Sequence, residues 1–196
     1  MRRIFSDYLE KLKYASESWS KIQLSYYALA CCERQLSIYK KASDCTSWNK
    51  FDILAENMKS AWTRLESVSF SAAKKCENCA PPEASNDVTS AASDVAFSIG
   101  ATMRFIASNR REYALGSAEI SFNLIDALIY SFSDMDINEN NDTIVDVHQV
   151  MVSELERQKQ DFLDVQLYRD NPDDLRSILR NRSKGASLAG ELWFFV

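Results

Sequence analysis

Residues 86–108 read NDVTSAASDVAFSIGATMRFIAS, and this stretch decides the fold class. Asn86 or Asp87 can cap a helix at its start. The apolar positions that follow recur at spacings of three and four residues: Val88, Ala92, Val95, Ile99, Met103 and Ile106. Ala and Ser crowd the first half of the stretch, which allows another helix to approach closely. The stretch therefore predicts an amphipathic helix that packs within a helical bundle.

Helix-breaking residues are rare and lie where this periodic pattern stops. The 196 residues include three prolines and four glycines. Pro81 and Pro82 lie together in the loop 78–86, and Asn171-Pro172 gives a helix start signal. The pattern predicts helices over 4–14, 19–42, 51–68, 87–106, 113–128, 144–165 and 172–182. We predict an all-α fold, a compact bundle of six to seven helices, as a single domain over 1–196 with a short apolar tail at 186–196.

Composition narrows the class of protein. Lys and Arg total 23 against 28 Asp and Glu, which gives a net charge of −5 and no general reason to bind nucleic acid. The longest uninterrupted apolar run, Tyr26 to Cys32, is too short to span a membrane. Five cysteines without a signal peptide indicate free thiols in a reducing compartment. We expect a cytoplasmic protein with neither a nucleic-acid nor a membrane partner.

An alternation of acidic and amide residues over 134–142 is reminiscent of a calcium-binding loop. The EF-hand requires Gly at its sixth position and a bidentate Glu at its twelfth. Counted from Asp134, those positions hold Glu139 and Val145. We therefore interpret the segment as a solvated loop between helices.

Cys76 and Cys79 form a lone C-x-x-C pair. A redox pair normally lies at a helix N-terminus, where the helix dipole stabilises the thiolate, whereas this pair follows a helix. The other cysteines do not have the spacing of a second zinc-binding pair. Free thiols are the favoured interpretation, with a labile disulfide as the alternative.

His148, the single histidine, lies in the apolar stripe of the predicted helix 144–165, which favours a core or interface role. No Glu precedes it by three residues, so the di-iron signature is missing. The segment 185–190 lacks the Gly-x-Ser-x-Gly spacing of a hydrolase, and a glycine-rich phosphate loop is absent. The sequence thus predicts no catalytic residue, no metal site and no cofactor. The alternative is an enzyme or ligand-binding bundle with a pocket that uses Glu33, Arg34 and His148.

Charge is distributed unevenly along the chain. Residues 134–164 hold nine acidic and two basic residues, a net of −7. Arg176, Arg180 and Lys184 follow one another at one-turn spacing in the last helix, where cations complement the helix dipole. The acidic segment offers a docking face for a basic partner, with Asp146 and Glu154 as candidate contacts.

The C-terminal residues Trp193, Phe194 and Phe195 are large aromatic anchors at the end of the apolar tail. A mobile, exposed apolar terminus favours unwanted association. We expect the tail to fold back on its own bundle or to complete a dimer or partner interface, where such side chains concentrate binding energy.

The segment Ala30-Cys31-Cys32-Glu33-Arg34, with Trp19 before it and Tyr39 after it, resembles the YjaG-like family of uncharacterised bacterial proteins. Further similarity lies around Asp94 and Ser121, over 154–162 and over 184–190. The chain departs from that family over 81–94, where an aromatic-rich segment is lacking. The resemblance implies an all-helical bacterial cytosolic protein and supplies no activity and no catalytic residues.

Two functional hypotheses follow from the absence of a chemical site. The first is a non-enzymatic protein that self-associates or binds another protein through helix faces and the C-terminal aromatics. The second is an immunity-type protein whose acidic face neutralises a basic toxin domain, since complementary charge speeds association.

Overall fold

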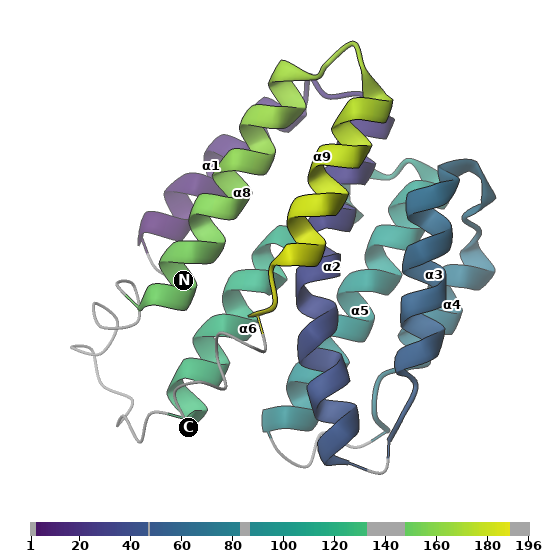
Figure 1. Ribbon diagram of the computed structural model, residues 1–196, viewed down its shortest axis with the longest axis vertical. Coiled ribbons are helices and arrows are strands. Elements are labelled where there is room, and N and C mark those ends of the chain that lie inside the picture. Colours follow the sequence, from purple (N-terminus) through teal and green to yellow (C-terminus); the bar gives the residue numbers. More distant parts are fainter. Residues whose placement is uncertain (1–2, 47, 83–86, 133–147, 189–196) are drawn as a thin grey trace.

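The computed structural model describes residues 3–46, 48–82, 87–132 and 148–188, and these residues form helices and no strand (Figure 1). The α-helices, labelled as in the figure, are α1 (Arg3–Ser16), α2 (Lys21–Cys45), α3 (Phe51–Thr63), α4 (Phe70–Glu77), α5 (Asp87–Ser108), α6 (Gly116–Phe132), α8 (Gln149–Leu167) and α9 (Pro172–Gly185). Two short 3-10 helices are η1 (Leu65–Ser67) and η2 (Arg111–Tyr113). The predicted all-α class is confirmed. None of the helices in the described segments is long and apolar enough to cross a membrane.

The described residues form eight α-helices, so the predicted number of six to seven is too low. The pattern predicts one helix over 51–68, whereas α3 ends at Thr63. Arg64 has an extended backbone with φ −155° and ψ 92°, which stops the helix. The hydroxyl of Ser69 then accepts a hydrogen bond from the backbone N–H of Ala72 at 3.3 Å and starts α4. The prediction of a single domain with a tail stays a prediction, and residues 189–196 lie outside the described residues.

Capping residues set the helix starts around the centre of the bundle. Ser20 and Gln23 form a capping box at the start of α2, in which the Gln23 side chain accepts from the Ser20 N–H at 2.7 Å. At the start of α9, Asn171 caps the helix and Pro172 occupies its first turn, as predicted. The predicted helix 144–165 is α8, which begins at Gln149, and residues 144–147 lie outside the described residues.

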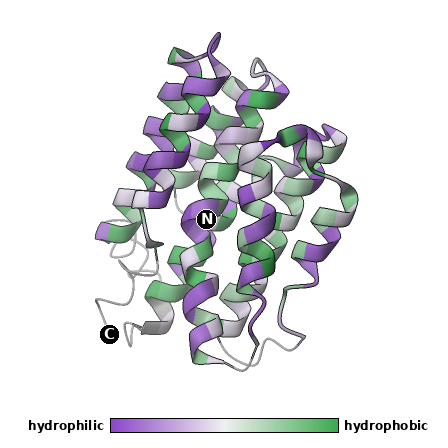
Figure 2. Cartoon of the chain, turned by 45° about the vertical axis from the view of Figure 1, so that its right-hand side comes forward, coloured by the Kyte–Doolittle hydropathy of each residue, from purple (hydrophilic) through white to green (hydrophobic). Residues whose placement is uncertain are grey.

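Helix α2 is the central element of the bundle. Of its 25 residues, 17 are buried, which is the burial expected of a helix that is surrounded on all sides. It packs against α3, α5, α6, α8 and α9. Figure 1 shows α8 to the left of α2, α9 in front of its upper half, and α3, α4 and α5 to its right. Coloured by hydropathy, the helices carry much of their hydrophobic surface on the sides that face one another (Figure 2).

Helices α4 and α5 approach one another closely at Gly100. A Cβ atom placed on Gly100 would lie 2.5 Å from Cγ of Glu77 and 3.3 Å from the carbonyl oxygen of Ala73. The missing side chain leaves room for Glu77, which accepts hydrogen bonds from the Nε and Nη2 atoms of Arg104. This part of the bundle is therefore held by small residues and one partly exposed ion pair.

Candidate functional site

Charged side chains are buried where α2 meets α8. Arg34 on α2 and both Glu154 and Asp161 on α8 have no solvent exposure. Nε of Arg34 donates to Oε2 of Glu154 at 3.0 Å, and its Nη1 donates to Oδ2 of Asp161 at 2.8 Å. Glu154 and Asp161 are two helical turns apart, so they share one face of α8. That face places both carboxylates around a single guanidinium.

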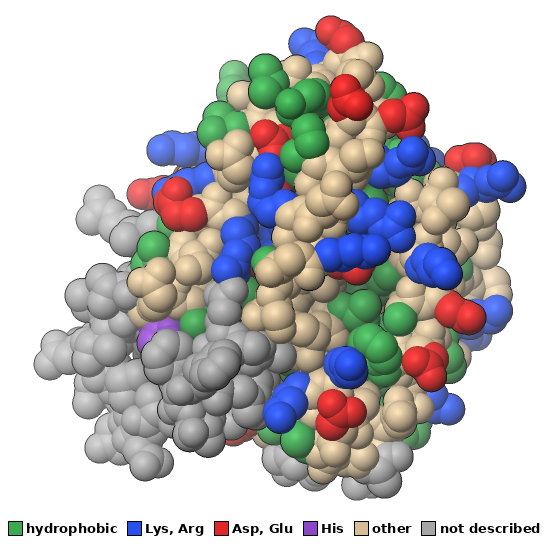
Figure 3. Space-filling model, in the orientation of Figure 1, with side chains coloured by type: hydrophobic (Ala, Val, Ile, Leu, Met, Phe, Trp, Pro, Cys, Tyr) green, Lys and Arg blue, Asp and Glu red, His purple; other side chains and the backbone are tan. Residues whose placement is uncertain are grey.

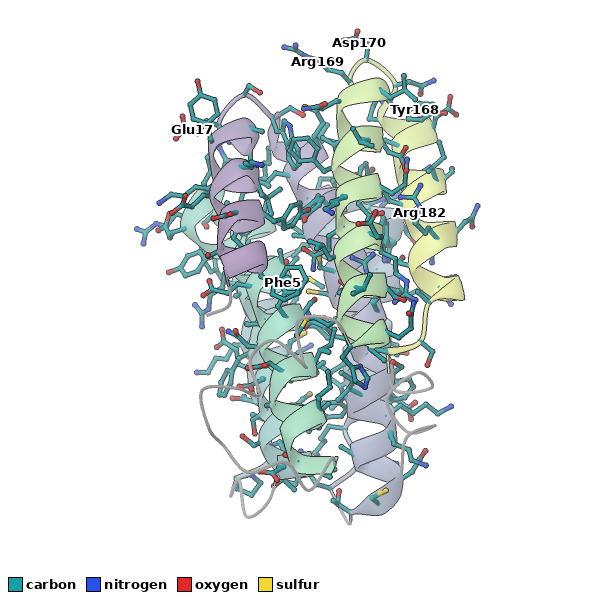
Figure 4. The ribbon with its side chains drawn as sticks, turned by 90° about the vertical axis from the view of Figure 1, so that its left-hand side faces the viewer. Phe5, Glu17, Tyr168, Arg169, Asp170 and Arg182 are labelled. Carbon is teal, nitrogen blue, oxygen red and sulfur yellow. The ribbon has the colours of Figure 1, made fainter. Side chains whose placement is uncertain are left out.

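Asp161 also binds a second arginine, which connects α9 to the same cluster. Arg182 on α9 donates from Nη1 to Oδ1 of Asp161 at 2.6 Å and from Nη2 to Asp164. Figure 4 shows Arg182 on α9 beside α8. Its side chain is 26% exposed, so it forms the solvent-facing end of the cluster. The cluster therefore joins three helices that are far apart in the sequence.

The charges in this cluster balance one another. Arg157 approaches Glu154 at 3.9 Å, so that Arg34, Arg157 and Arg182 face Glu154, Asp161 and Asp164. Burial alone lowers the pKa of Arg34, but the carboxylates of Glu154 and Asp161 outweigh it and raise that pKa well above its ordinary value. Arg34 is therefore a permanent cation, and its removal would leave two buried carboxylates without their main counter-ion.

A chain of hydrogen bonds leads from the cluster to α1. Gln158 donates to Oε1 of Glu154 at 2.9 Å and accepts from the hydroxyl of Tyr27 at 3.2 Å. The Tyr27 hydroxyl lies 3.0 Å from that of Tyr8 on α1. Burial raises the pKa of both phenols well above the ordinary value, so both stay neutral. The cluster thus fixes the position of Tyr8 through a relay of neutral groups.

Tyr8 lines an apolar groove between the outer faces of α1 and α8. The two helices lie side by side in Figure 4 and run in the same direction. The groove has a volume of about 510 Å³ and is lined by Asp7, Tyr8, Lys11, Leu12, Lys159, Phe162 and Leu163. The lining residue Leu163 is 53% exposed. Tyr14, three residues after Lys11, and Leu167, four residues after Leu163, continue the same helix faces and are 80% and 74% exposed. The ion cluster does not line the groove: Arg34, Glu154 and Asp161 are connected to it only through Gln158, Tyr27 and Tyr8.

Several residues predicted from the sequence as partner contacts are placed differently or lie outside the described residues. Glu154 is fully buried in the ion cluster, so the interpretation of this side chain as a surface contact is wrong. Asp146 and the aromatic residues Trp193, Phe194 and Phe195 lie outside the described residues.

Burial also removes most acidic side chains from the described part of the predicted docking face over 134–164. Its described part, 148–164, holds four acidic residues, of which Glu154, Asp161 and Asp164 are buried. Glu156 alone of these four is mainly exposed, at 64% of its side chain. The charges of Glu154, Asp161 and Asp164 are thus neutralised by arginines, whereas the exposed Glu156 pairs with Lys159 at 2.7 Å.

The structure does not bring together the three residues of the alternative pocket, Glu33, Arg34 and His148, because each of them contacts a different partner. The carboxylate of Glu33 accepts from the indole N–H of Trp62 at 3.0 Å, and Arg34 turns to α8. His148 is the N-cap of α8, where its Nδ1 accepts from the N–H of Val150 at 3.4 Å. Partial burial lowers the pKa of His148. The expected position of His148 within an apolar helical stripe is wrong, because the helix begins after it.

All five cysteines are free thiols, which confirms the favoured interpretation. Cys76 and Cys79 are both buried, and burial raises the pKa of Cys76 to about 12. Cys32 contacts the hydroxyls of Thr102 and Ser98, and burial raises its pKa to about 11. Such thiols are poor nucleophiles because nucleophilic attack requires the thiolate. Across the residues that the structure describes, no group of three or more His, Cys, Asp or Glu side chains is arranged to hold a metal ion.

The sequence contains a signal for the ion cluster: polar residues occupy positions that the helical spacing assigns to the core. Glu154, Gln158 and Asp161 follow one another at spacings of four and three residues, as apolar core positions do. Their spacing places them on one helix face, and a complementary buried cation on another helix is then required. Arg34, which lies among apolar residues in the segment 26–39, is that cation.

Comparison with known proteins gives one family and one solved fold. The family model of a protein of unknown function, DUF416, matches residues 11–188. The chain is also similar to the crystal structure of a DUF416 family protein from Shewanella baltica OS155, with 21% sequence identity and a TM-score of 0.70. That similarity covers 85% of this chain and 89% of the other, and at this identity it concerns the fold. No curated protein matches the chain.

Proposed function

We propose that this chain, which belongs to the DUF416 family of proteins of unknown function, is a non-enzymatic helical protein that associates with a second copy of itself through α1 and α8. The observation that carries the proposal is the apolar groove between these helices, bordered by the exposed side chains of Tyr14, Leu163 and Leu167. Single exposed apolar residues are ordinary on protein surfaces, whereas contiguous ones mark interaction sites.

The charges beside the groove favour a second copy as its occupant. Asp7 and Lys11 on α1 are both exposed and one helical turn apart. In a two-fold symmetric dimer whose axis is perpendicular to α1 and passes between Asp7 and Lys11, the two α1 helices run antiparallel, so that Asp7 of each copy faces Lys11 of the other. The two ion pairs then form with the same geometry, and the apolar side chains between them are covered. A surface with this pattern is complementary to itself.

A non-enzymatic role agrees with the chemistry of the interior. The buried acids and arginines are bound to one another, and Cys32 and Cys76 are protonated thiols at neutral pH. The relay through Gln158 and Tyr27 holds Tyr8 at the floor of the groove. We therefore assign the ion cluster the task of making the groove rigid, since a preformed surface loses less entropy on binding.

Sedimentation velocity on the full chain tests the proposal. We expect dimers that dissociate only below about 10 μM, and we expect Leu163→Glu/Leu167→Glu to yield monomers because charges then enter the apolar interface. Phe97→Glu on α5 is the matched control, because Phe97 is 51% exposed and Leu163 is 53% exposed. Circular dichroism checks that each variant is folded. A wild-type chain that is monomeric at about 100 μM, or a dimer that Leu163→Glu/Leu167→Glu leaves intact, would overturn the proposal.

A charge swap tests the symmetry of the contact. Asp7→Lys places two cations opposite two cations and should weaken the dimer, whereas Asp7→Lys/Lys11→Asp restores both pairs with exchanged signs. Recovery of the dimer in the double variant is expected. Equal weakening in both variants would contradict the antiparallel arrangement.

The predicted contribution of Trp193, Phe194 and Phe195 to an interface is a separate part of the proposal. A chain ending at Leu192 removes them. Because burial of Trp193 and Phe194 would contribute on the order of 3–5 kcal/mol, their loss should lower the melting temperature or dissociate the dimer. Unchanged melting and sedimentation would show that neither role applies.

A further inference from the structure

A second cleft lies on another part of the molecule, between the start of α2, the end of α5, η1 and α9. It has a volume of about 570 Å³, within the range of small-molecule sites. Its lining includes apolar residues such as Ile106 and Val68 as well as the ring of Tyr26. It shares no lining residue with the groove between α1 and α8.

Three cations from separate elements converge on this cleft. They are Lys21 at the first position of α2, Arg64 immediately before η1 and Arg176 on α9, and Glu66 is the one acidic residue in the lining. Figure 3 shows Lys and Arg side chains gathered on this face, beside α9 and toward α3. Asp173 pairs with Arg176 from outside the lining, so three positive charges stand against two negative ones and the cleft keeps a positive potential, to which the N-terminus of α2 adds.

The cations are available because their present ion pairs are weak. Arg64 lies 3.6 Å from Glu66, and both side chains are more than two-thirds exposed. Arg176 pairs at 3.1 Å with Asp173, whose side chain is 80% exposed. Lys21 forms no ion pair within the described part of the chain. Exposed pairs of this kind contribute little, so a bound anion can replace them with charge-assisted hydrogen bonds.

The floor of the cleft is rigid. Tyr26 is 7% exposed and stacks on Trp62 with ring centroids 5.8 Å apart and an angle of 8° between the planes. Burial raises the pKa of Tyr26, and the nearby Arg176 guanidinium opposes that rise. The Tyr26 hydroxyl is therefore a neutral group beside a cation, suited to hydrogen bonding with an anionic oxygen.

We infer that this cleft binds a small organic molecule that carries phosphate groups. Arginine is suited to phosphate because its planar guanidinium donates two parallel hydrogen bonds. The apolar wall formed by Ile106 and Val68 accommodates the uncharged part of the molecule, and Lys21 and Arg64 bind the charged part. A site of this kind is independent of dimer formation, because the groove residues Leu163 and Leu167 do not line it.

Isothermal titration calorimetry at low salt, with ADP, pyrophosphate and adenosine as probes, tests the inference. We expect ADP and pyrophosphate to bind with dissociation constants below about 1 mM and adenosine to bind at least about tenfold more weakly, because the cations recognise phosphate. Arg176→Gln and Arg64→Gln should each weaken ADP binding by about tenfold. Lys184→Gln is the matched control on α9, because Lys184 is an exposed cation outside the lining.

Three outcomes would overturn the inference: no binding of either phosphorylated probe, adenosine binding as tight as that of ADP, or equal weakening by Lys184→Gln and Arg176→Gln. Circular dichroism confirms that the variants are folded. Leu163→Glu/Leu167→Glu is expected to bind ADP like the wild type, so failure of the dimer proposal leaves this test unaffected.

Discussion

The side of α2 that faces α8 buries charges, whereas the side that faces α5 buries thiols, hydroxyls and small apolar side chains. On the first side, Arg34 contacts Glu154 and Asp161 with no exposure to solvent. On the second, Cys32 contacts Ser98 and Thr102, and α5 contributes alanines such as Ala92 and Ala96. The two sides of one helix thus depend on different interactions, and they should fail differently when a single side chain is changed.

The contrast between the charged and the neutral side of α2 means that substitutions within one core should change the free energy of unfolding by very different amounts. Loss of a neutral side chain removes packing and a weak hydrogen bond, which surrounding atoms partly compensate. Loss of one partner from a buried ion cluster leaves an uncompensated charge, and small local movements cannot expose that charge to water. We therefore expect the charged side to dominate the response of the free energy of unfolding to mutation.

Arg34→Met should have the largest effect. It leaves Glu154 and Asp161 buried without their shared cation and should lower the free energy of unfolding by about 3–5 kcal/mol in urea titrations. Arg64→Met is the control, because Arg64 is 69% exposed and its loss should change stability by less than about 0.5 kcal/mol. The double variant Arg34→Met/Glu154→Met should be more stable than Arg34→Met. A loss below about 1 kcal/mol for Arg34→Met would contradict the larger sensitivity expected of the charged side of α2.

Alkaline pH should weaken the neutral side. The pKa of Cys32 rises from the ordinary 9.0 to about 11 on burial, so the folded state keeps a proton that the unfolded state releases above pH 9. Rising pH therefore favours unfolding, and the contribution of Cys32, up to about 3 kcal/mol, is lost between about pH 9 and 11. Urea titrations at pH 8 and 10.5 measure this loss. It should shrink in Cys32→Ala and persist in a Cys45→Ala control, since Cys45 is exposed.

Tyr27→Phe should have a smaller effect although it lies on the charged side. It removes the hydroxyl that links Tyr8 to Gln158, and neutral hydrogen bonds contribute about 1–2 kcal/mol when a buried partner loses its contact. Thermal unfolding compares it with Tyr14→Phe, for which no change is expected because Tyr14 is 80% exposed. A loss as large as that of Arg34→Met would mean that the relay, and not the charges, dominates this side.

Gly100→Ala should have the smallest net effect. The added Cβ displaces Glu77 and weakens its pair with Arg104, which opposes the gain of about 1 kcal/mol that Ala brings to a helix interior. Stability should therefore change by less than about 1 kcal/mol in the wild type and should increase when Gly100→Ala is made in a Glu77→Ala background. The absence of such a difference in a double-mutant cycle would show that Glu77 does not limit the approach of α4 and α5.

The sequence predicts much of the helical architecture because helix breakers and caps act locally. Pro172 and its cap Asn171 define the start of α9, and the apolar spacing over 88–106 corresponds to α5. The sequence pattern does not predict the start of α4, because the only signal for it is a single capping serine, Ser69, after a continuous apolar pattern. The resemblance to a family of uncharacterised proteins is confirmed at the level of a DUF416 match.

The candidate site was less predictable because it depends on contacts between distant segments. From the sequence alone, Arg34 belongs to a candidate pocket and Glu154 to a candidate docking face, whereas in the structure they form one ion pair. Periodicity assigns a face to each residue of a helix and does not say which faces meet. The groove and the basic cleft are formed by neighbouring helices, so neither has a local sequence signal.

The separation between Arg34 and its carboxylate partners also bears on how the protein is made. Glu154 follows Arg34 by 120 residues, and Asp161 follows it by 127. At about 5–20 residues per second, a ribosome adds Glu154 roughly 6–24 s after Arg34. Until then the guanidinium of the nascent α2 must stay hydrated, so α2 cannot complete its packing before α8 has been made. An early helix of the bundle therefore becomes native only after a late one has arrived.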